Sequence, residues 1–270
     1  MLNKKTISVV LPVLNTDVDT ASRCIDSLIR QTFTDIEIII VNESKNTEVN
    51  KKLREYSEAD QRIRILLLEN GKNLAYAINS GILLSSGEFI ARMDIDDECL
   101  PDRFEKQLRF LFDYPEVAVV GSHTYIRQGS EDHNIRKFPL DHSSIKRALQ
   151  FFNPICHPSV LMRKQVVSSV GLYDEKFFHA EDYELWCRLV SRGYRLANID
   201  EPLLHYSLPA SEVRAKENWL YNLKIKIAYF GKFSSKFSSI IGIGIVFFMY
   251  LAPPSVIIQL YKLRNLVRKQ

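Results

Sequence analysis

Four consecutive residues, Asp94-Ile95-Asp96-Asp97, carry the side chains best suited to chemistry in this chain. They follow Glu88–Met93, a mainly apolar run that predicts a buried strand. Three carboxylates crowded at the end of a strand repel one another unless a cation lies between them, and oxygen ligands of this kind suit Mg²⁺ or Mn²⁺. A metal held there would clamp a diphosphate at the carboxyl edge of an α/β sheet. The alternative is a solvated acidic turn in which an Asp caps the helix that starts near Pro101.

Strands and helices alternate along the first 192 residues with the spacing of an α/β fold. Apolar runs predict buried strands, and segments with apolar residues three and four positions apart predict the helices between them. Together they predict a Rossmann-like, mostly parallel sheet with helices on both faces. The polar stretch 127–145 predicts a surface excursion. The predicted strands are 6–13, 36–41, 63–68, 88–93, 117–126 and 159–162, and the predicted helices are 21–31, 47–56, 74–84, 103–112 and 181–192.

The end of the chain differs in composition, which predicts two parts, 1–209 and 210–270. The second part holds ten Lys or Arg and two Glu, and it begins with a predicted basic helix over 211–230. Residues 237–261 then contain no charged side chain, but Pro253-Pro254 divides this run into pieces too short to cross a bilayer. Lysines and arginines on both flanks disfavour a single span.

We therefore expect a helical, membrane-associating tail over 210–270, either a re-entrant hairpin or a helix in the plane of an anionic leaflet. A buried pair of C-terminal helices and a true single span are the alternatives. A nucleic-acid partner is not expected, because the positive charges flank an apolar run instead of following a groove. Four scattered cysteines without metal-ligand spacing predict reduced thiols of a cytosolic protein.

Eight short motifs follow one another in the first 209 residues. They are Val9-Val10-Leu11-Pro12-Val13-Leu14-Asn15, Ser27-Leu28-Ile29-Arg30-Gln31-Thr32, Ala77-Ile78-Asn79-Ser80-Gly81, Gly87–Asp97, Pro101-Asp102-Arg103-Phe104, His157-Pro158-Ser159, Gly171–Glu175 and Ala180–Trp186. Each motif alone is a weak signal, but together, in this order and at these distances, they are specific. The chain thereby resembles family 2 glycosyltransferases of the GT-A fold.

The resemblance implies inverting transfer of a sugar from a nucleotide-diphosphate sugar, with a divalent metal. It places Asp94 nearest the ribose and Asp96 on the metal, with Asp97 as a further ligand or support. Asp182 matches the base of the family's Glu-Asp pair, which takes the proton of the acceptor hydroxyl. Glu181 beside it would raise the pKa of Asp182 by like-charge repulsion. The alternative for this pair is that both carboxylates only complement a helix dipole.

The nucleotide pocket follows the family pattern less closely. Pro12 and Asn15 shape the first turn, as in relatives. Where relatives carry an Asp-Asp-Gly-Ser-like tract, this chain has Asn42-Glu43-Ser44, so Glu43 is the group expected to accept from the base. Lys72 is a candidate contact for a phosphate or the base. The Tyr-Arg and His of relatives near the end of the domain are replaced by Tyr206-Ser207-Leu208-Pro209, which leaves His205 as a possible substitute ligand.

The predicted function is transfer from a nucleotide-diphosphate sugar, with UDP favoured, to a hydroxyl of a lipid-linked glycan in bacterial surface polysaccharide synthesis, such as O-antigen or capsule. The tail places this activity on the cytoplasmic face of the inner membrane. One alternative is a sugar-phosphate nucleotidyltransferase, which would need a glycine-rich, basic loop after the first strand. This chain has Pro12–Asp17 there. The other alternative is a membrane-bound, non-catalytic scaffold with a degenerate site.

Overall fold

Strand β1 (Ile7–Val13) lies inside the parallel half of a nine-stranded sheet. It pairs in parallel with β2 (Ile36–Asn42) on one side and β4 (Phe89–Arg92) on the other, and β2 pairs in parallel with β3 (Ile63–Leu67). The chain therefore moves outward from β1 and then returns to its other side. Such a reversal opens a ligand-binding crevice at the carboxyl ends of the strands. The computed structural model describes residues 6–69, 71–128, 131–208, 216–253, 256–257 and 259.

The other half of the sheet is mixed. Its strands continue from β4 in the order β8 (Leu161–Arg163), β6 (Val117–Gln128), β9 (Arg195–Ser207) and β5 (Glu98–Cys99), with β7 (Glu131–Arg136) beside β6. Strands β6 and β9 are parallel, whereas β8, β5 and β7 pair antiparallel with their neighbours. The antiparallel pairing of β5 with β9 turns the segment after Asp97 back over the carboxyl edge of the sheet.

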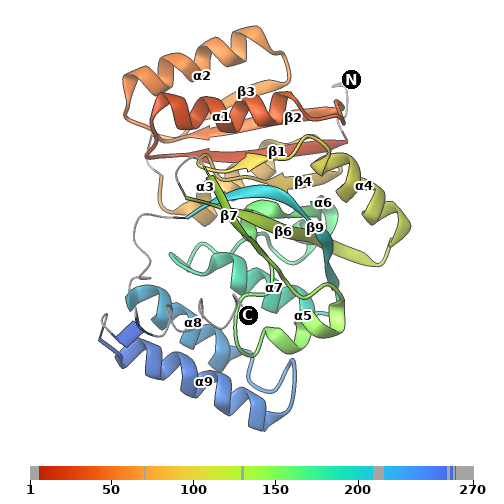
Figure 1. Ribbon diagram of the computed structural model, residues 1–270, viewed down its shortest axis with the longest axis vertical. Helices are drawn as coiled ribbons and strands as arrows, with labels where there is room; N and C mark the ends of the chain where they lie inside the picture. The colour runs from red at the N-terminus through yellow and green to blue at the C-terminus, as the bar shows by residue number, and fades with distance from the viewer. Residues whose placement is uncertain are drawn as a thin grey trace.

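Helices cover both faces of the sheet (Figure 1). Because successive strand residues point to opposite faces, Val9 and Leu11 pack in one apolar core and Val10 in the other. The first face is covered by α1 (Val18–Ile29), α2 (Thr47–Ala59) and α4 (Arg103–Asp113). The second face is covered by α3 (Leu74–Leu84), α5 (His142–Ala148), α6 (Lys164–Ser169) and α7 (Glu181–Ser191), with the 3₁₀ turn η1 (His157–Ser159) below β8.

The predicted α/β architecture is confirmed, and the predicted helix over 74–84 has the observed bounds. Most described side chains of the stretch 127–145 are exposed or half-buried, as expected for a surface segment, but the stretch is more ordered than predicted. That stretch contains β7 and the start of α5, and the side chains of Phe138 and Ile145 are buried in the protein. Strand β9 was not predicted at all. The four cysteines are free and buried, as expected for packed thiols.

In the described part of the tail, helices α8 (Lys216–Ala228) and α9 (Lys236–Leu251) lie side by side at the end of the molecule far from α2 (Figure 1). Two parts of the predicted tail lie outside the described residues. They are the start of the predicted basic helix, 211–215, and the lysines and arginines at 262–269. Helix α9 has 16 residues, or about 24 Å at roughly 1.5 Å per residue. Among the described residues, none of the helices combines the length and apolar character needed to cross a bilayer.

Candidate active site

The three aspartates predicted to bind a metal lie together in the turn that follows β4. The backbone N–H of Asp97 donates to the carbonyl of Asp94 at 3.2 Å, which closes the turn. One carboxylate oxygen from each of Asp94, Asp96 and Asp97 can be chosen so that all lie within 4.8 Å of one another. Asp97 is buried, Asp94 is half-buried and Asp96 reaches solvent. The three carboxylates of the turn therefore range from buried to solvent-exposed.

This cluster has an uncompensated negative charge. Burial and the charge of Asp94 raise the pKa of Asp96, and burial with both neighbouring carboxylates raises the pKa of Asp97 well above its usual range. The Oδ1 atom of Asp97 accepts from the backbone N–H of Ser207 at 2.8 Å. Its Oδ2 atom is buried and has no hydrogen-bond partner among the described residues. An unsatisfied buried oxygen among repelling carboxylates fits a hard divalent cation, which Asp96 and Asp97 would hold.

Arg92, the last residue of β4, neutralises one member of the cluster. Its side chain is 2% exposed, and its two terminal nitrogens contact both carboxylate oxygens of Asp94. Charge-assisted pairs of this bidentate form are strong and fix the orientation of both groups. Asp94 is therefore already paired with a positive charge, so a metal ion would chiefly neutralise the carboxylates of Asp96 and Asp97. The sequence analysis treated Arg92 only as part of an apolar strand.

Strand β9 adds a second contact that was not predicted. Ser207, at its end, donates from its hydroxyl to the carbonyl of Asp96 at 2.5 Å as well as from its backbone to Asp97. His205 stands two residues earlier, with its ring stacked on Tyr125 at 5.2 Å. The altered Tyr206-Ser207 tract therefore still supports the acidic turn, through backbone and hydroxyl groups.

The predicted base, Asp182, stands in the first turn of α7. Ala180 before it adopts a left-handed conformation, with φ 60°, which costs roughly 1–3 kcal/mol for a residue with a side chain. The Asp182 Oδ2 atom accepts from Asn153 Nδ2 at 2.5 Å, and its Oδ1 atom accepts from the backbone N–H of Tyr183 at 2.7 Å. The carboxylate is thus held in one orientation by a loop on one side and by its own helix on the other.

Glu181 is buried, and its pKa is raised to about 7 by burial and by the charge of Asp182. The like-charge repulsion predicted for the pair thus raises the pKa of Glu181. Glu181 Oε1 lies 3.8 Å from His157 Nδ1, and His157 Nε2 is 2.9 Å from the hydroxyl of Tyr173. Burial, followed by the charge of Arg92, lowers the pKa of His157 well below its usual range. A neutral imidazole therefore links Glu181 to Tyr173.

The acidic turn and the Glu-Asp pair both act electrostatically on one buried side chain, Tyr173. Burial raises the pKa of the Tyr173 hydroxyl, and the negative charges of Asp182, Glu181 and Asp94 raise it further. The two acidic groups come from strands and helices almost ninety residues apart in the sequence. One predicted metal ligand, Asp94, and the predicted base pair therefore influence the same buried hydroxyl group.

The predicted nucleotide contacts gather at the same edge of the sheet. Pro12 is the penultimate residue of β1 and Asn15 lies exposed beyond its end. Glu43 follows β2, and its backbone N–H donates to the carbonyl of Val13 at 2.8 Å. Burial raises the pKa of Glu43. A Cβ atom on Gly71 would lie 1.2 Å from Glu43 Oε2, so any other residue at 71 would force the Glu43 side chain to move.

Lys72 is the next residue along the chain and is exposed. Its Nζ atom lies 4.9 Å from the centre of the Tyr76 ring, which orients the ammonium beside the start of α3. The neighbouring Asn73 caps that helix by accepting from the backbone N–H of Tyr76 at 2.9 Å. Trp186, the last residue of the Ala180–Trp186 motif, is fully buried in the core.

Replacing Glu181 with glutamine should stabilise the metal-free protein increasingly as the pH rises from about 4.5 to 7. The folded-state pKa of about 7 lies above the ordinary value of 4.5. At pH values above 4.5, ionisation of Glu181 therefore opposes folding. The gain for the variant should reach at most about 3 kcal/mol. Urea unfolding of wild type and Glu181→Gln at pH 4.5 and pH 8 measures it, and an equal difference at both pH values would contradict the assignment.

Comparison with known proteins agrees with this geometry. Residues 8–171 match the family described as Glycosyl transferase family 2. The amylovoran biosynthesis glycosyltransferase AmsE of Erwinia amylovora is 30% identical over 83% of this chain and 87% of its own length. The O-antigen biosynthesis glycosyltransferase WbnJ of Escherichia coli is 35% identical over 75% of this chain and 79% of its own.

Solved structures support the fold at lower identity. S. aureus TarS 1–349 in complex with UDP-GlcNAc superposes with a TM-score of 0.70 at 14% identity, over 91% of this chain and 72% of that one. This chain spans only 41% of the longer TarS structure. Mannosyltransferase PcManGT from Pyrobaculum calidifontis, in complex with GDP-Man and Mn²⁺, gives a TM-score of 0.68 at 13% identity, over 93% of this chain and 71% of that one. The chain has the GT-A fold and belongs to glycosyl transferase family 2.

Proposed function

We propose that this protein is a metal-dependent, inverting glycosyltransferase that uses a nucleotide-diphosphate sugar, with a UDP-sugar favoured. The observation that supports the proposal is the presence of two groups of carboxylates, the acidic turn at Asp94–Asp97 and the pair Glu181-Asp182, whose charges both act on the buried hydroxyl of Tyr173. One group of carboxylates suits a cation beside a diphosphate, and the other suits proton transfer on the opposite side of a sugar. Neither group alone would specify this reaction.

In the proposed reaction the acceptor hydroxyl attacks the anomeric carbon of the donor sugar. The new carbon–oxygen bond forms as the bond to the diphosphate breaks, and the electron pair of that bond leaves with the diphosphate. Asp182 takes the hydroxyl proton, with its two oxygens oriented by Asn153 and by the backbone of Tyr183. Attack from the side opposite the leaving group inverts the anomeric centre. A divalent cation held by Asp96 and Asp97 would supply Lewis-acid stabilisation to the departing diphosphate.

The donor's nucleoside would lie along Pro12–Asn15, with Glu43 accepting an N–H of the base and Lys72 near a phosphate or the base. Asp94, fixed by Arg92, would accept from the ribose. S. aureus TarS has been solved with UDP-GlcNAc and PcManGT with GDP-Man, so the base is best tested directly. Thermal unfolding with UDP, GDP or dTDP, each with and without Mn²⁺, provides the test.

UDP at a hundredfold excess over its dissociation constant should raise the melting temperature by roughly 5–10 °C, and only with Mn²⁺. A larger shift with GDP would contradict the assigned base. Absence of any shift, together with absence of turnover of a UDP-sugar, would favour the non-catalytic scaffold.

The acceptor we propose is a lipid-linked glycan in bacterial surface polysaccharide synthesis, at the cytoplasmic face of the inner membrane. The names of AmsE and WbnJ, which refer to amylovoran and O-antigen biosynthesis, support the polysaccharide. The tail supports the membrane, because α9 is packed with its small residues inward. Ser239 and Gly242 face the protein, whereas large apolar side chains are exposed; these are Phe237, Ile240, Ile241, Ile245, Phe247, Phe248 and Leu251.

The exposed face of α9 should bind anionic bilayers. Lys232 and Lys236 are exposed at its start, and basic residues beside an apolar surface favour a negatively charged leaflet. Replacing Phe237 and Phe248 with aspartate should abolish sedimentation with phosphatidylglycerol vesicles while the melting temperature stays within a few degrees, since both side chains are at least half exposed. Unchanged sedimentation of the double variant would contradict this role for α9.

A further inference from the structure

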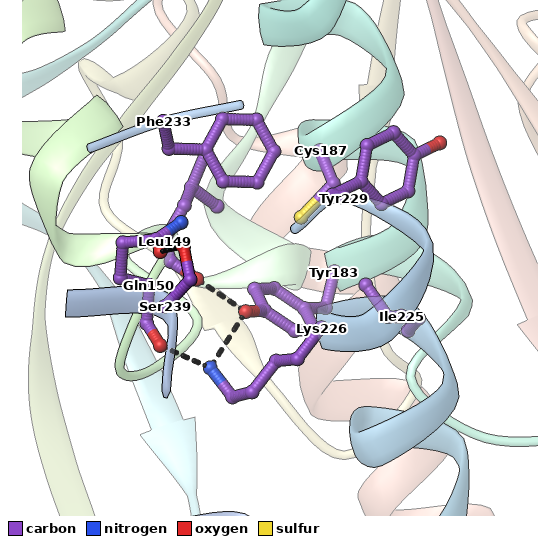
Figure 2. Close-up of a pocket in the computed structure, with 9 residues that line it drawn as sticks. All are labelled: Leu149, Gln150, Tyr183, Cys187, Ile225, Lys226, Tyr229, Phe233 and Ser239. Atoms are coloured by element: carbon purple, nitrogen blue, oxygen red, sulfur yellow. Dashed lines mark hydrogen bonds between the residues drawn. The ribbon is translucent and has the colours of Figure 1, made fainter. Parts of the chain in front are cut away.

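A buried polar junction joins the tail to the loop that holds the predicted base (Figure 2). It lies where α7, α8, α9 and the end of α5 meet, around a cavity of about 10 Å³, which has room for about one water molecule. The side chains of Gln150, Tyr183, Lys226 and Ser239 converge there. This space is too small for a sugar or a nucleotide, so the junction is a structural contact and not a ligand site.

Lys226 of α8 is the centre of the junction. Its side chain is 7% exposed, and its Nζ atom donates to the carbonyl of Gln150 at 2.6 Å and to the hydroxyl of Tyr183 at 3.0 Å (Figure 2). The Tyr183 hydroxyl donates in turn to the carbonyl of Leu149. Burial lowers the pKa of Lys226 to about 8. A lysine is costly to bury, so these acceptors define the position of the ammonium closely.

Helix α9 contacts the same loop. The hydroxyl of Ser239 donates to Gln150 Oε1 at 2.5 Å. A Cβ atom on Gly242 would lie 2.1 Å from the Gln150 carbonyl oxygen, so only glycine permits the helix to approach this closely. Both the carbonyl and the side chain of Gln150 are therefore bound by the tail, one by each helix.

The loop that begins at Gln150 contacts Asp182 through a hydrogen bond. Three residues on, Asn153 donates to Asp182 Oδ2 at 2.5 Å. On the other side, the backbone N–H of Tyr183 donates to Asp182 Oδ1, and the hydroxyl of the same tyrosine accepts from Lys226. Both oxygens of the Asp182 carboxylate are thus connected to Lys226. One path runs through Asn153 and the loop that begins at Gln150, and the other runs through Tyr183.

We propose that the tail supports the active site from outside and that Lys226 and Ser239 are positioning residues for the base Asp182. The proposal rests on the proposed function in one respect, the role of Asp182 as the base. Without Lys226 the segment 150–153 would lose the contact that fixes its start, and Asn153 would hold Asp182 less firmly. Small displacements of a catalytic group lower turnover by up to about a hundredfold.

The test compares Lys226→Met with Lys164→Met in the full-length protein. Lys164 is the matched control because its Nζ atom also donates to a carbonyl at 2.6 Å, that of Ser85, at the opposite end of β4 from Asp94. The two readouts are hydrogen exchange of backbone amides and release of UDP from UDP-GlcNAc, UDP-glucose and UDP-galactose with Mn²⁺. Ser239→Ala is a milder variant that serves if Lys226→Met does not fold.

We expect amide exchange over 150–153 and 181–183 to accelerate at least tenfold in Lys226→Met, and the turnover number to fall 10- to 100-fold with the donor KM within about threefold. Asn153→Ala should match this loss, and the double variant should lose no more than either single variant. The Lys164→Met control should show neither effect.

Two outcomes separate this proposal from the proposed function. If Lys226→Met and Ser239→Ala keep wild-type exchange over 150–153, or keep full turnover while Asp182→Asn is inactive, the positioning role is wrong and the base is unaffected. If Asp182→Asn remains active, the assignment of the base is wrong instead.

Discussion

Replacing Asp182 with asparagine is expected to lower the rate of sugar release from the donor by roughly 10²- to 10⁴-fold, the range that a positioned general base contributes. The amide has nearly the shape of the carboxylate but cannot take the acceptor proton. Its Oδ1 can still accept one of the two hydrogen bonds that now fix Asp182, from Asn153 or from the backbone of Tyr183. Nucleotide and Mn²⁺ binding should persist, because those ligands are assigned to other residues.

Steady-state release of UDP from a UDP-sugar, together with the thermal shift caused by UDP and Mn²⁺, measures both expectations. Asp113→Asn is the control, since Asp113 is exposed at the end of α4 and its pairing with Arg109 is a loose surface contact of 3.9 Å. Wild-type turnover in Asp182→Asn would exclude it as the base and direct attention to Glu181.

Replacing Asp97 with asparagine is expected to have two opposite effects. Turnover should fall by roughly a thousandfold, because Lewis-acid stabilisation contributes several kcal/mol and Asp97 is assigned to hold the cation. Without metal, however, the variant should be more stable than wild type. Burial and two neighbouring carboxylates raise the pKa of Asp97, so its ionised form opposes folding.

The sign of this stability change follows from the raised pKa. The contribution of Asp97 to folding is fully present below the unfolded pKa of about 3.9 and is lost as the pH rises through the higher folded-state pKa. The advantage of Asp97→Asn should therefore grow from pH 4 to pH 8 in EDTA, and added Mn²⁺ should raise the melting temperature of wild type only. A variant less stable than wild type in EDTA at pH 8 would mean that the turn does not need a cation.

Periodicity predicted the parallel half of the fold because its strands are mainly apolar runs, such as Ile36–Asn42. The same reasoning missed β9. Its middle reads Asp200-Glu201-Pro202, which is typical of a turn. The strand continues through these residues because its pairing with β6 shifts register on both sides of His123, which lies opposite Pro202. The turn-like residues therefore occupy an irregular part of the ladder.

The residues of the candidate site also fall into those that the sequence alone identified and those that it did not. The aspartates and the Glu-Asp pair could be recognised because each is a short run of chemically suited residues. Arg92, Asn153 and Ser207 could not, because each acquires its role only from a partner brought near by folding. Asn153 lies 29 positions from Asp182 and Ser207 lies 111 from Asp96.

The tail shows the limit of composition as a guide. Its apolar run predicted association with a membrane, and large apolar side chains of α9 are indeed exposed. Ser239 and Gly242 read as incidental small residues in that run, yet they form the face that packs on Gln150. Only the three-dimensional structure distinguishes the docked face from the exposed one.

The most direct test of the central claim is anomalous diffraction from crystals grown with UDP and Mn²⁺. The account predicts a manganese peak at about 2.0–2.2 Å from carboxylate oxygens of Asp96 or Asp97, with the diphosphate on the same ion and the uracil beside Glu43. A manganese ion elsewhere, or a nucleotide bound away from the turn at Asp94–Asp97, would contradict it.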